Sequence, residues 1–251
     1  MAMASSDFLT AWSQALGEAG ASWTVPEQHW SRELAQAEQQ HLVQAGQVRL
    51  LGHRDWLFRY GDPVEACFFV VLEGRLKLSM PDAPGGERTT GLVGPGDLFG
   101  ADSCAGLRGY THEAVCLTSS ARVIAVSSAR FEEAVRQAPQ LALALSRALA
   151  QETRRAREMS EATSLPAEVR VAHLLLTLTH RFGEPLQNGT VRVVLNLRHD
   201  ELASLAGTTR VSATQAFRRL RDAKAVTGTR GVYEVQPLTL QAWIAAGAAD
   251  Q

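Results

Sequence analysis

Residues 197–235 read LRHDELASLAGTTRVSATQAFRRLRDAKAVTGTRGVYEV. This stretch predicts two short helices joined by a tight turn and followed by a small hairpin. We expect the first helix at residues 200–206, with Gly207 just past its end, where the turn requires a residue that tolerates a positive φ. The hydroxyl of Thr208 or Thr209 can cap the second helix by accepting hydrogen bonds from its free N–H groups.

The second predicted helix carries one apolar stripe at helical spacing, formed by Ala213, Ala216, Phe217 and Leu220. The opposite face is polar and cationic, with Val211, Thr214, Gln215, Arg218 and Arg219. A helix that is packed on one side and offers hydrogen-bonding cations on the other fits a DNA major groove. The stretch therefore favours DNA binding. The alternative is an ordinary amphipathic helical hairpin with a solvated basic face.

Composition places the chain among globular proteins with two domains, because it has 251 residues, of which 45% are hydrophobic and 20% charged. The formal net charge is −1, but the charge is unevenly distributed. The segment from Pro166 onward contains ten Lys and Arg and seven Asp and Glu, a net charge of +3. The residues before it contain fifteen Lys and Arg and nineteen Asp and Glu, a net charge of −4. A polyanion should therefore bind the C-terminal third.

The cysteines predict a reducing compartment. Cys67, Cys104 and Cys116 are odd in number and have no C-x-x-C spacing, so neither a disulfide framework nor a zinc site is indicated. They are expected to be small apolar side chains, and a redox role for an exposed cysteine stays open. The sequence shows neither a signal segment nor a long apolar run, so we expect a cytoplasmic protein without membrane contact.

The pattern of hydrophobic residues changes within the first half of the chain. Residues 1–46 predict helices, whereas residues 47–127 contain short strands of period two separated by glycine-rich turns. Many close strands without intervening helices indicate an antiparallel roll, sandwich or barrel. A metal-dependent jelly-roll enzyme needs clustered histidines, but His53 and His112 are isolated in the sequence.

Residues 128–163 predict a short helix and then a long one. The long helix has a seam at steps of four and three, typical of a two-stranded coiled coil: Leu141, Leu145, Ala148, Glu152, Ala156 and Met159. The seam favours a dimerisation helix, and packing on the chain's own strands is the alternative. Residues 164–166 form a predicted hinge, and another amphipathic helix follows at residues 166–182, within a DNA-binding domain at residues 164–251.

The order of these elements resembles the CRP/FNR family of bacterial transcription regulators. The resemblance covers about residues 47–235 and is most specific in GDPVEACFFVVLEGRLKL, VGPGDLFG and LASLAGTTRVSATQAFRRLRDA. It implies an α+β fold with an N-terminal antiparallel, jelly-roll-like β-roll at residues 47–127, a long dimerisation helix and a C-terminal winged helix-turn-helix. It also implies a homodimer on a near-palindromic DNA site, with residues 186–190 where family members contact RNA polymerase; a plain turn is the alternative there.

The family's effector site can be matched position by position. Members that bind cyclic AMP carry a glutamate after the glycine of the G-D-x-x-G turn, and an Arg-Ser pair ten residues later. The matching residues of this chain, which we call the effector-matched positions, are Gly100, Ala101, Thr111 and His112, with Arg155 on the dimer helix. Because a cyclic phosphate needs a cation and oriented donors, cyclic AMP control is not expected, with Arg108 or His112 as the nearest substitutes.

Other cofactors of the family find little support in the sequence. The N-terminal cysteine cluster of iron–sulfur members is absent, and no cofactor is expected. Haem-binding members use scattered ligands, so haem ligation stays open for His41, His53, Cys67 and His112.

The second predicted helix departs from the family pattern in a way that can be read chemically. Where the family usually has an Arg-Glu pair at the start of this helix, the chain has Arg210-Val211, which is similar to nitrogen-control members. A later arginine of the family is replaced by Gln215. Arg210 can bind guanine, Gln215 adenine, and Val211 the thymine methyl group. Residues expected to contact phosphates are Arg198, His199, Thr208, Thr209, Ser212, Arg218 and Arg230, with Thr229 beside Arg230 at the hairpin tip.

Together these observations predict a sequence-specific transcription regulator that is independent of cyclic AMP. The sequence contains no nucleophile–base pair, no paired carboxylates at useful spacing and no phosphate-binding loop, so an enzyme is not expected. The alternative is a small-molecule, redox or haem sensor whose output is a protein contact.

Overall fold

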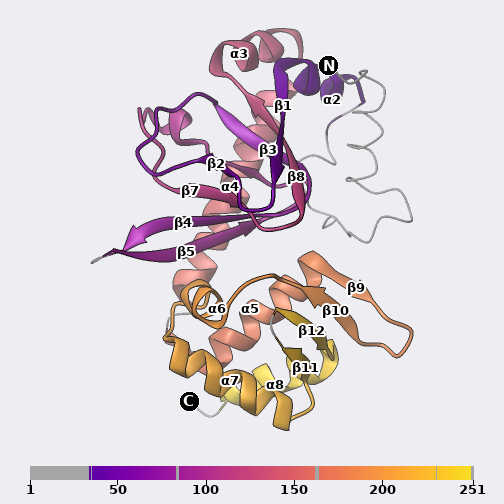
Figure 1. Cartoon of the computed structure of the whole chain (residues 1–251). Coiled ribbons are helices and arrows are strands. Elements are labelled where there is room, and N and C mark those ends of the chain that lie inside the picture. The colour runs from indigo at the N-terminus through magenta and orange to yellow at the C-terminus, as the bar shows by residue number, and fades with distance from the viewer. Residues whose placement is uncertain (1–33, 35, 83–84, 162–163, 230, 250–251) are drawn as a thin grey trace. The chain divides into compact units, whose positions relative to one another are not determined.

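The computed structural model describes residues 34, 36–82, 85–161, 164–229 and 231–249 (Figure 1). The chain divides into two compact units; the described part of the first ends at Thr153 and that of the second begins at Arg154. Most of the predicted N-terminal helical segment lies outside the described residues, and helix α2 (Gln36–Ala45) is its described part. No described helix is long and apolar enough to cross a membrane.

The first unit contains two four-stranded antiparallel sheets, as expected for a β-roll. One sheet has the order β1-β8-β3-β6, with bounds Gly46–Gly52, Ser120–Val126, Phe68–Glu73 and Leu98–Phe99. The other has the order β2-β7-β4-β5, with bounds Trp56–Phe58, Glu113–Cys116, Leu76–Asp82 and Gly86–Val93. The short strands expected between residues 47 and 127 are present as β1–β5, β7 and β8. Strand β6, which has only two residues, was not predicted.

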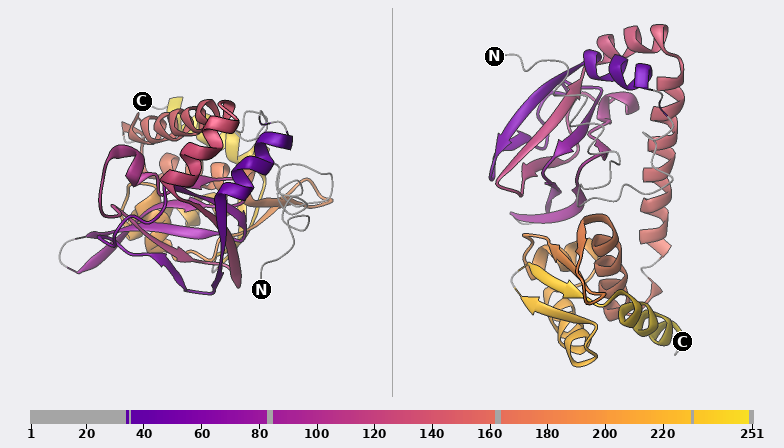
Figure 2. Two further views of the ribbon diagram at one scale, coloured as in Figure 1. Left: turned by 90° about the horizontal axis from the view of Figure 1, so that it is seen from above. Right: turned by 90° about the vertical axis from the view of Figure 1, so that its right-hand side faces the viewer.

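Strand β3 shows how the roll is built, because alternate side chains enter two different cores. Phe68 and Val70 lie in a cluster with residues of helices α2, α3 (Ser128–Gln137) and α4 (Gln140–Glu161). Phe69 and Val71 lie in a second cluster shared with the other sheet. The sheet that contains β3 is therefore covered by helices on one face and by the second sheet on the other (Figures 1 and 2).

The first half of α4 packs on its own β-roll. Leu141 and Ala148, two residues of the predicted coiled-coil seam, are buried in the helix-side cluster, and Leu145 packs against it partly buried. Glu152 and Ala156 are exposed, and the side chain of Met159 lies outside the described residues. Packing on the roll, one of the two alternatives for the seam, therefore describes its first half; dimerisation stays a prediction.

The second unit is a winged helix-turn-helix. Its elements after α4 are α5 (Ala167–Phe182), β9 (Gly183–Pro185), β10 (Val191–Val194), α6 (His199–Leu205), α7 (Arg210–Asp222), β11 (Val226–Thr229), β12 (Val232–Val235) and α8 (Pro237–Ala249). The strands form one antiparallel sheet of order β11-β12-β10-β9. Helix α8 was not predicted.

Candidate nucleic-acid interface

The turn between α6 and α7 has the predicted chemistry. Gly207 has a φ of +61°, in the left-handed region that glycine adopts at little cost. Of the two candidate caps, Thr209 is the one that caps α7, because its Oγ1 accepts a hydrogen bond from the N–H of Ser212 at 3.2 Å. Helix α6 begins and ends one residue earlier than predicted.

Helix α7 has one buried face and one face exposed to solvent. Its predicted apolar stripe is confirmed, since Ala213, Ala216, Phe217 and Leu220 are all at most 1% exposed. On the opposite side, Arg210, Val211 and Gln215 are exposed, and Val211 keeps 66% of its surface open to solvent. A large apolar side chain exposed beside a cation and an amide offers one group of each kind that base edges in a major groove recognise.

The turn is held from outside by an arginine that the sequence analysis did not identify. Arg170 of α5 donates to the carbonyl oxygens of Ala206 and Gly207 at 3.1 and 3.0 Å, and to that of Leu165 at 3.1 Å. The carbonyls at the end of a helix have no partner within the helix, so a guanidinium can bind several of them at once. Arg170 therefore fixes the turn from which α7 projects.

His199 is placed at the start of α6, against α7. Its ring stacks on Phe217 with centroids 4.9 Å apart and planes inclined by 8°. Burial lowers the pKa of His199 below its ordinary value of 6.5, and the guanidinium groups of Arg221 and Arg210 lower it further, while Asp200 opposes them. The ring is therefore neutral at pH 7 in the absence of DNA.

Arg198 is less free to hold a phosphate than the sequence suggests. Its guanidinium lies 3.1 Å from a carboxylate oxygen of Asp200 and 3.7 Å from one of Glu201, and its side chain is 70% exposed. Such exposed ion pairs are weak and exchange readily. A DNA phosphate at Arg198 must displace these carboxylates.

The other predicted phosphate contacts differ in their surroundings. Arg218 is exposed on α7, Thr208 is half-buried, and the hydroxyls of Thr209 and Ser212 lie 3.0 Å apart within the helix cap. Arg230 lies outside the described residues. Arg219, which the sequence places on the outer face, forms an ion pair with Glu168 of α5 instead.

The loop at residues 186–190 is a structured turn between β9 and β10. The backbone N–H of Leu186 donates to the carbonyl of Thr190 at 2.8 Å, and the hydroxyl of Thr190 donates to Asn188 Oδ1 at 2.5 Å. These bonds account for the sequence of the turn without a partner protein, so polymerase contact there stays a prediction.

Two of the effector-matched positions, Thr111 and His112, form a hydrogen-bond network with Asp102. Asp102 Oδ1 accepts from the Thr111 hydroxyl at 2.6 Å and from the Thr111 N–H at 3.1 Å, and Thr111 Oγ1 lies 3.0 Å from His112 Nδ1. Burial lowers the pKa of His112; Asp102 opposes the shift and Arg88 adds to it. The network places the Asp102 carboxylate beside Thr111, the position matched to the arginine of cyclic AMP-binding members.

The turn before this network is tightly packed. Gly100 has a φ of +67°, and a Cβ there would lie 2.9 Å from the ring of Phe69, so both backbone and space require glycine. Ala101 packs partly buried against the helix-side cluster. The side chain of Arg155 lies outside the described residues.

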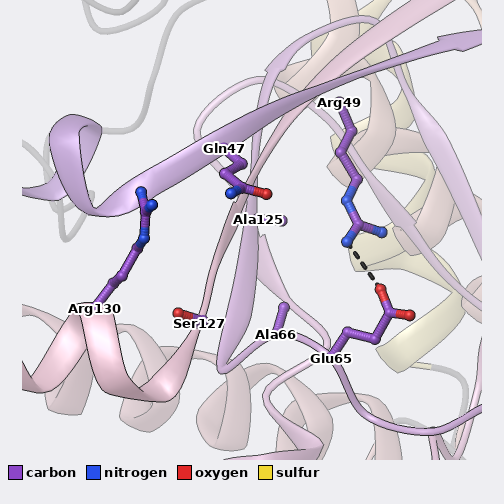
Figure 3. Close-up of a pocket in the computed structure, with 7 residues that line it drawn as sticks. All are labelled: Gln47, Arg49, Glu65, Ala66, Ala125, Ser127 and Arg130. Atoms are coloured by element: carbon purple, nitrogen blue, oxygen red, sulfur yellow. Dashed lines mark hydrogen bonds and ion pairs between the residues drawn. The ribbon is translucent and has the colours of Figure 1, made fainter.

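A small polar pocket lies elsewhere on the β-roll (Figure 3). Its lining is Gln47, Arg49, Glu65, Ala66, Ala125, Ser127 and Arg130. Arg49 and Glu65 pair across it at 2.9 Å, and Arg130 comes from the first turn of α3. The pocket shares no residue with the effector-matched positions. Within the described part of the chain, no three His, Cys, Asp or Glu residues gather as metal ligands would.

Comparisons with known proteins agree with both units. Residues 169–242 match the model of a Crp-like helix-turn-helix domain, and residues 48–138 match that of a cyclic nucleotide-binding domain. The chain is 31% identical over 204 residues to the cyclic AMP receptor protein of Thermus thermophilus, a match that covers 81% of this chain and 90% of the relative. It is 28% identical over 176 residues to the global nitrogen regulator of a Synechocystis species, covering 69% and 77%.

A solved structure shows the same fold. FixK2 from Bradyrhizobium japonicum superposes with a TM-score of 0.65 at 20% identity, over 78% of this chain and 96% of that one. The fold resemblance agrees with the sequence relatives, one named as a cyclic AMP receptor protein and the other as a global nitrogen regulator. Both family models and the relative from Thermus thermophilus show that the chain belongs to the CRP/FNR family of DNA-binding transcription regulators.

Proposed function

We propose that this regulator binds a near-palindromic DNA site as a homodimer, with α7 of each protomer in a major groove, and that it does so without cyclic AMP. The observation that carries the proposal is the division of α7 into a buried stripe and an exposed face with Arg210, Val211 and Gln215. In a two-fold dimer, the two helices meet successive major grooves about 34 Å apart.

Each exposed group has a chemical counterpart on the bases. Arg210 donates two hydrogen bonds to guanine O6 and N7, Gln215 pairs with adenine N6 and N7, and Val211 contacts the thymine methyl group. Phosphate contacts by His199, Thr208, Thr209, Ser212 and Arg218 set the register of the helix without reading the sequence. Arg198 contributes less, because a phosphate there has to displace the Asp200 and Glu201 carboxylates from its guanidinium.

Independence from cyclic AMP is supported at the effector-matched positions. Thr111 replaces the cation that would bind the cyclic phosphate, and its hydroxyl is already bonded to the Asp102 carboxylate. A phosphate bound at this point would have no cation to form charge-assisted hydrogen bonds with, and it would lie near the negative charge of Asp102.

The first experiment is selection from random DNA duplexes by the purified protein at physiological salt, without and with cyclic AMP. We expect the same two-fold symmetric site to be enriched in both arms. Enrichment only with cyclic AMP would show that DNA binding depends on this nucleotide, contrary to the proposal. Absence of enrichment in both arms would contradict specific DNA binding and favour a sensor whose output is a protein contact.

Arg210→Ala tests the base readout on the selected site. We expect affinity for that site to fall at least about tenfold, because a bidentate arginine–guanine pair is worth ~1–3 kcal/mol, and the preference at one base position to relax. Arg192→Ala, which removes an exposed cation from β10, is the matched control and should leave the preference unchanged. An unchanged preference in Arg210→Ala would remove this residue from base recognition.

A further inference from the structure

Two of the three cysteines meet in the β-roll although 37 residues separate them. Cys67 directly precedes β3, Cys104 lies in the 3-10 turn η2 (Asp102–Ala105), and their sulfur atoms are 3.3 Å apart. Cys67 is buried, whereas Cys104 is exposed. One thiol can therefore be reached by a dissolved reagent, and the other lies behind it within contact distance.

The surrounding backbone holds both thiols in place. The N–H of Cys67 donates to the carbonyl of Val126 at 2.6 Å, which anchors it beside β8. On η2, the Ser103 hydroxyl and the Cys104 thiol both point at the carbonyl of Cys67, at 3.5 and 3.7 Å. A disulfide has its sulfurs about 2.05 Å apart, so bond formation needs a closure of only roughly 1.2 Å.

We propose that Cys67 and Cys104 form a reversible intrachain disulfide by exchange with a low-molecular-weight disulfide, the class to which oxidised glutathione belongs. The proposal does not depend on the DNA site or on cyclic AMP. Cys116 takes no part, because its buried thiol donates to the carbonyl of Thr118 at 3.4 Å in a different part of the roll.

The exchange balances in two steps. The thiolate of Cys104 attacks one sulfur of the small disulfide, a mixed disulfide forms, and one small thiolate leaves and takes up a proton. The Cys67 thiol then loses its proton and attacks the Cys104 sulfur, which releases the second small thiol. The two protein thiols are oxidised by two electrons, and one small disulfide is reduced to two thiols.

The local environment makes this reaction slow at neutral pH. Although the residue is exposed, partial desolvation of its thiol, with a contribution from the neighbouring Cys67, raises the pKa of Cys104 to about 11, so little thiolate is present. The pair is therefore best tested at equilibrium, after long incubation in buffers of defined reduced and oxidised glutathione.

The experiment uses the full chain in such a redox series, followed by alkylation and peptide mass spectrometry. We expect one Cys67–Cys104 linked peptide in the oxidised buffers, with Cys116 still alkylated, and full reversal by dithiothreitol. Cys116→Ala should behave like the unaltered chain. Cys67→Ala should stop at the first step and keep a glutathione on Cys104, while Cys104→Ala should take up none.

Thermal unfolding supplies a second readout that does not depend on peptide recovery. Closing a loop of 37 residues should raise the Tm of the oxidised protein by roughly 5–10 °C, and only where both cysteines are present. Because Cys104 is exposed, Cys104→Ala should fold normally and serves as the reference if Cys67→Ala does not fold. Cross-links between chains, pairing with Cys116, or free thiols throughout the series would each overturn the proposal.

Discussion

At the scale of single residues, Arg170 has the clearest mechanical role. Its three hydrogen bonds to the carbonyls of Leu165, Ala206 and Gly207 join α5 to the turn before α7. We expect Arg170→Met, which keeps the aliphatic stem, to lower the free energy of unfolding of the second unit by about 2 kcal/mol, because hydrogen bonds from charged donors are lost. DNA affinity should fall with it.

Chemical denaturation measures this effect. Arg192→Met is the matched control: it removes an exposed arginine from β10, and its effect should stay within about 0.5 kcal/mol. Equal stability of the two variants would mean that Arg170 does not hold the turn.

His199 predicts a pH dependence of folding. Its pKa in the folded chain is below the ordinary value of 6.5, first because of burial and then because of Arg221 and Arg210. The unfolded chain therefore binds the proton more tightly, so the stability that the neutral ring contributes is present above pH 6.5 and is lost as the pH falls below it. We expect the second unit to lose less stability between pH 7.5 and 5.5 in His199→Gln than in the unaltered chain.

This comparison concerns the pH slope and not the absolute stability, since glutamine also removes the stacking on Phe217. Urea titrations at the two pH values provide the slope. A slope that is the same in both proteins would show that other groups determine the acid sensitivity of this unit.

At the scale of the element, one side of α4 is packed on the β-roll and the other sides are half-buried or exposed. Leu141 is 2% exposed in the β-roll core, so Leu141→Ala should cost about 3 kcal/mol of stability. Leu145, Leu149, Glu152 and Ala156 follow one another at steps of four, three and four beside the packed side, half-buried or exposed. We expect a second copy of the chain to pack along this row.

Leu149→Ala tests that expectation. It should raise the dissociation constant of the dimer about tenfold, equivalent to ~1.4 kcal/mol, while the β-roll keeps its stability. Leu143→Ala is the control, since Leu143 is 46% exposed and lies on another side of the helix. Sedimentation measurements compare the two, and an unchanged dissociation constant in Leu149→Ala would move the dimer contact elsewhere.

The elements differ in how far the sequence could predict them. Regular periods predicted the longer strands and the stripe of α7, and residue chemistry predicted the turn at Gly207 and a cap by Thr208 or Thr209, of which Thr209 is the one observed. Strand β6 could not be predicted, because a strand of two residues is too short to show an alternating pattern. The seam of α4 was ambiguous because the same apolar spacing serves the chain's own roll or a partner.

The candidate site shows the same division. Exposure of Arg210 and Gln215 follows from the periodicity of α7. The hold of Arg170 on the turn and the bond from Thr111 to Asp102 depend on chain segments brought together only by folding, 36 and 9 residues apart. No local pattern marks such partners, so sequence reasoning could not identify them.

At the scale of the whole molecule, charge is concentrated where DNA is expected. The chain is near neutral overall, but residues from Pro166 onward carry +3, so binding should weaken as salt rises. We expect Arg218→Ala to weaken binding to all sequences about equally. In a dimer it should reduce the slope of log affinity against log salt by roughly two, one phosphate contact for each protomer.

Fluorescence anisotropy over a salt series measures that slope. Arg192→Ala again serves as the control and should leave the slope unchanged. A change of base preference in Arg218→Ala, with the salt slope preserved, would place this side chain on the bases instead of the backbone.

The division of α7 has a consequence for how such a regulator can diverge. The four side chains that hold the helix in the fold share no position with Arg210, Val211 and Gln215. Under the base readout proposed above, a duplicated gene could exchange these three outer residues, and with them the set of promoters it serves, while the folded scaffold stays intact. Rewiring a regulatory circuit would then take few mutations, each neutral for the survival of the protein itself.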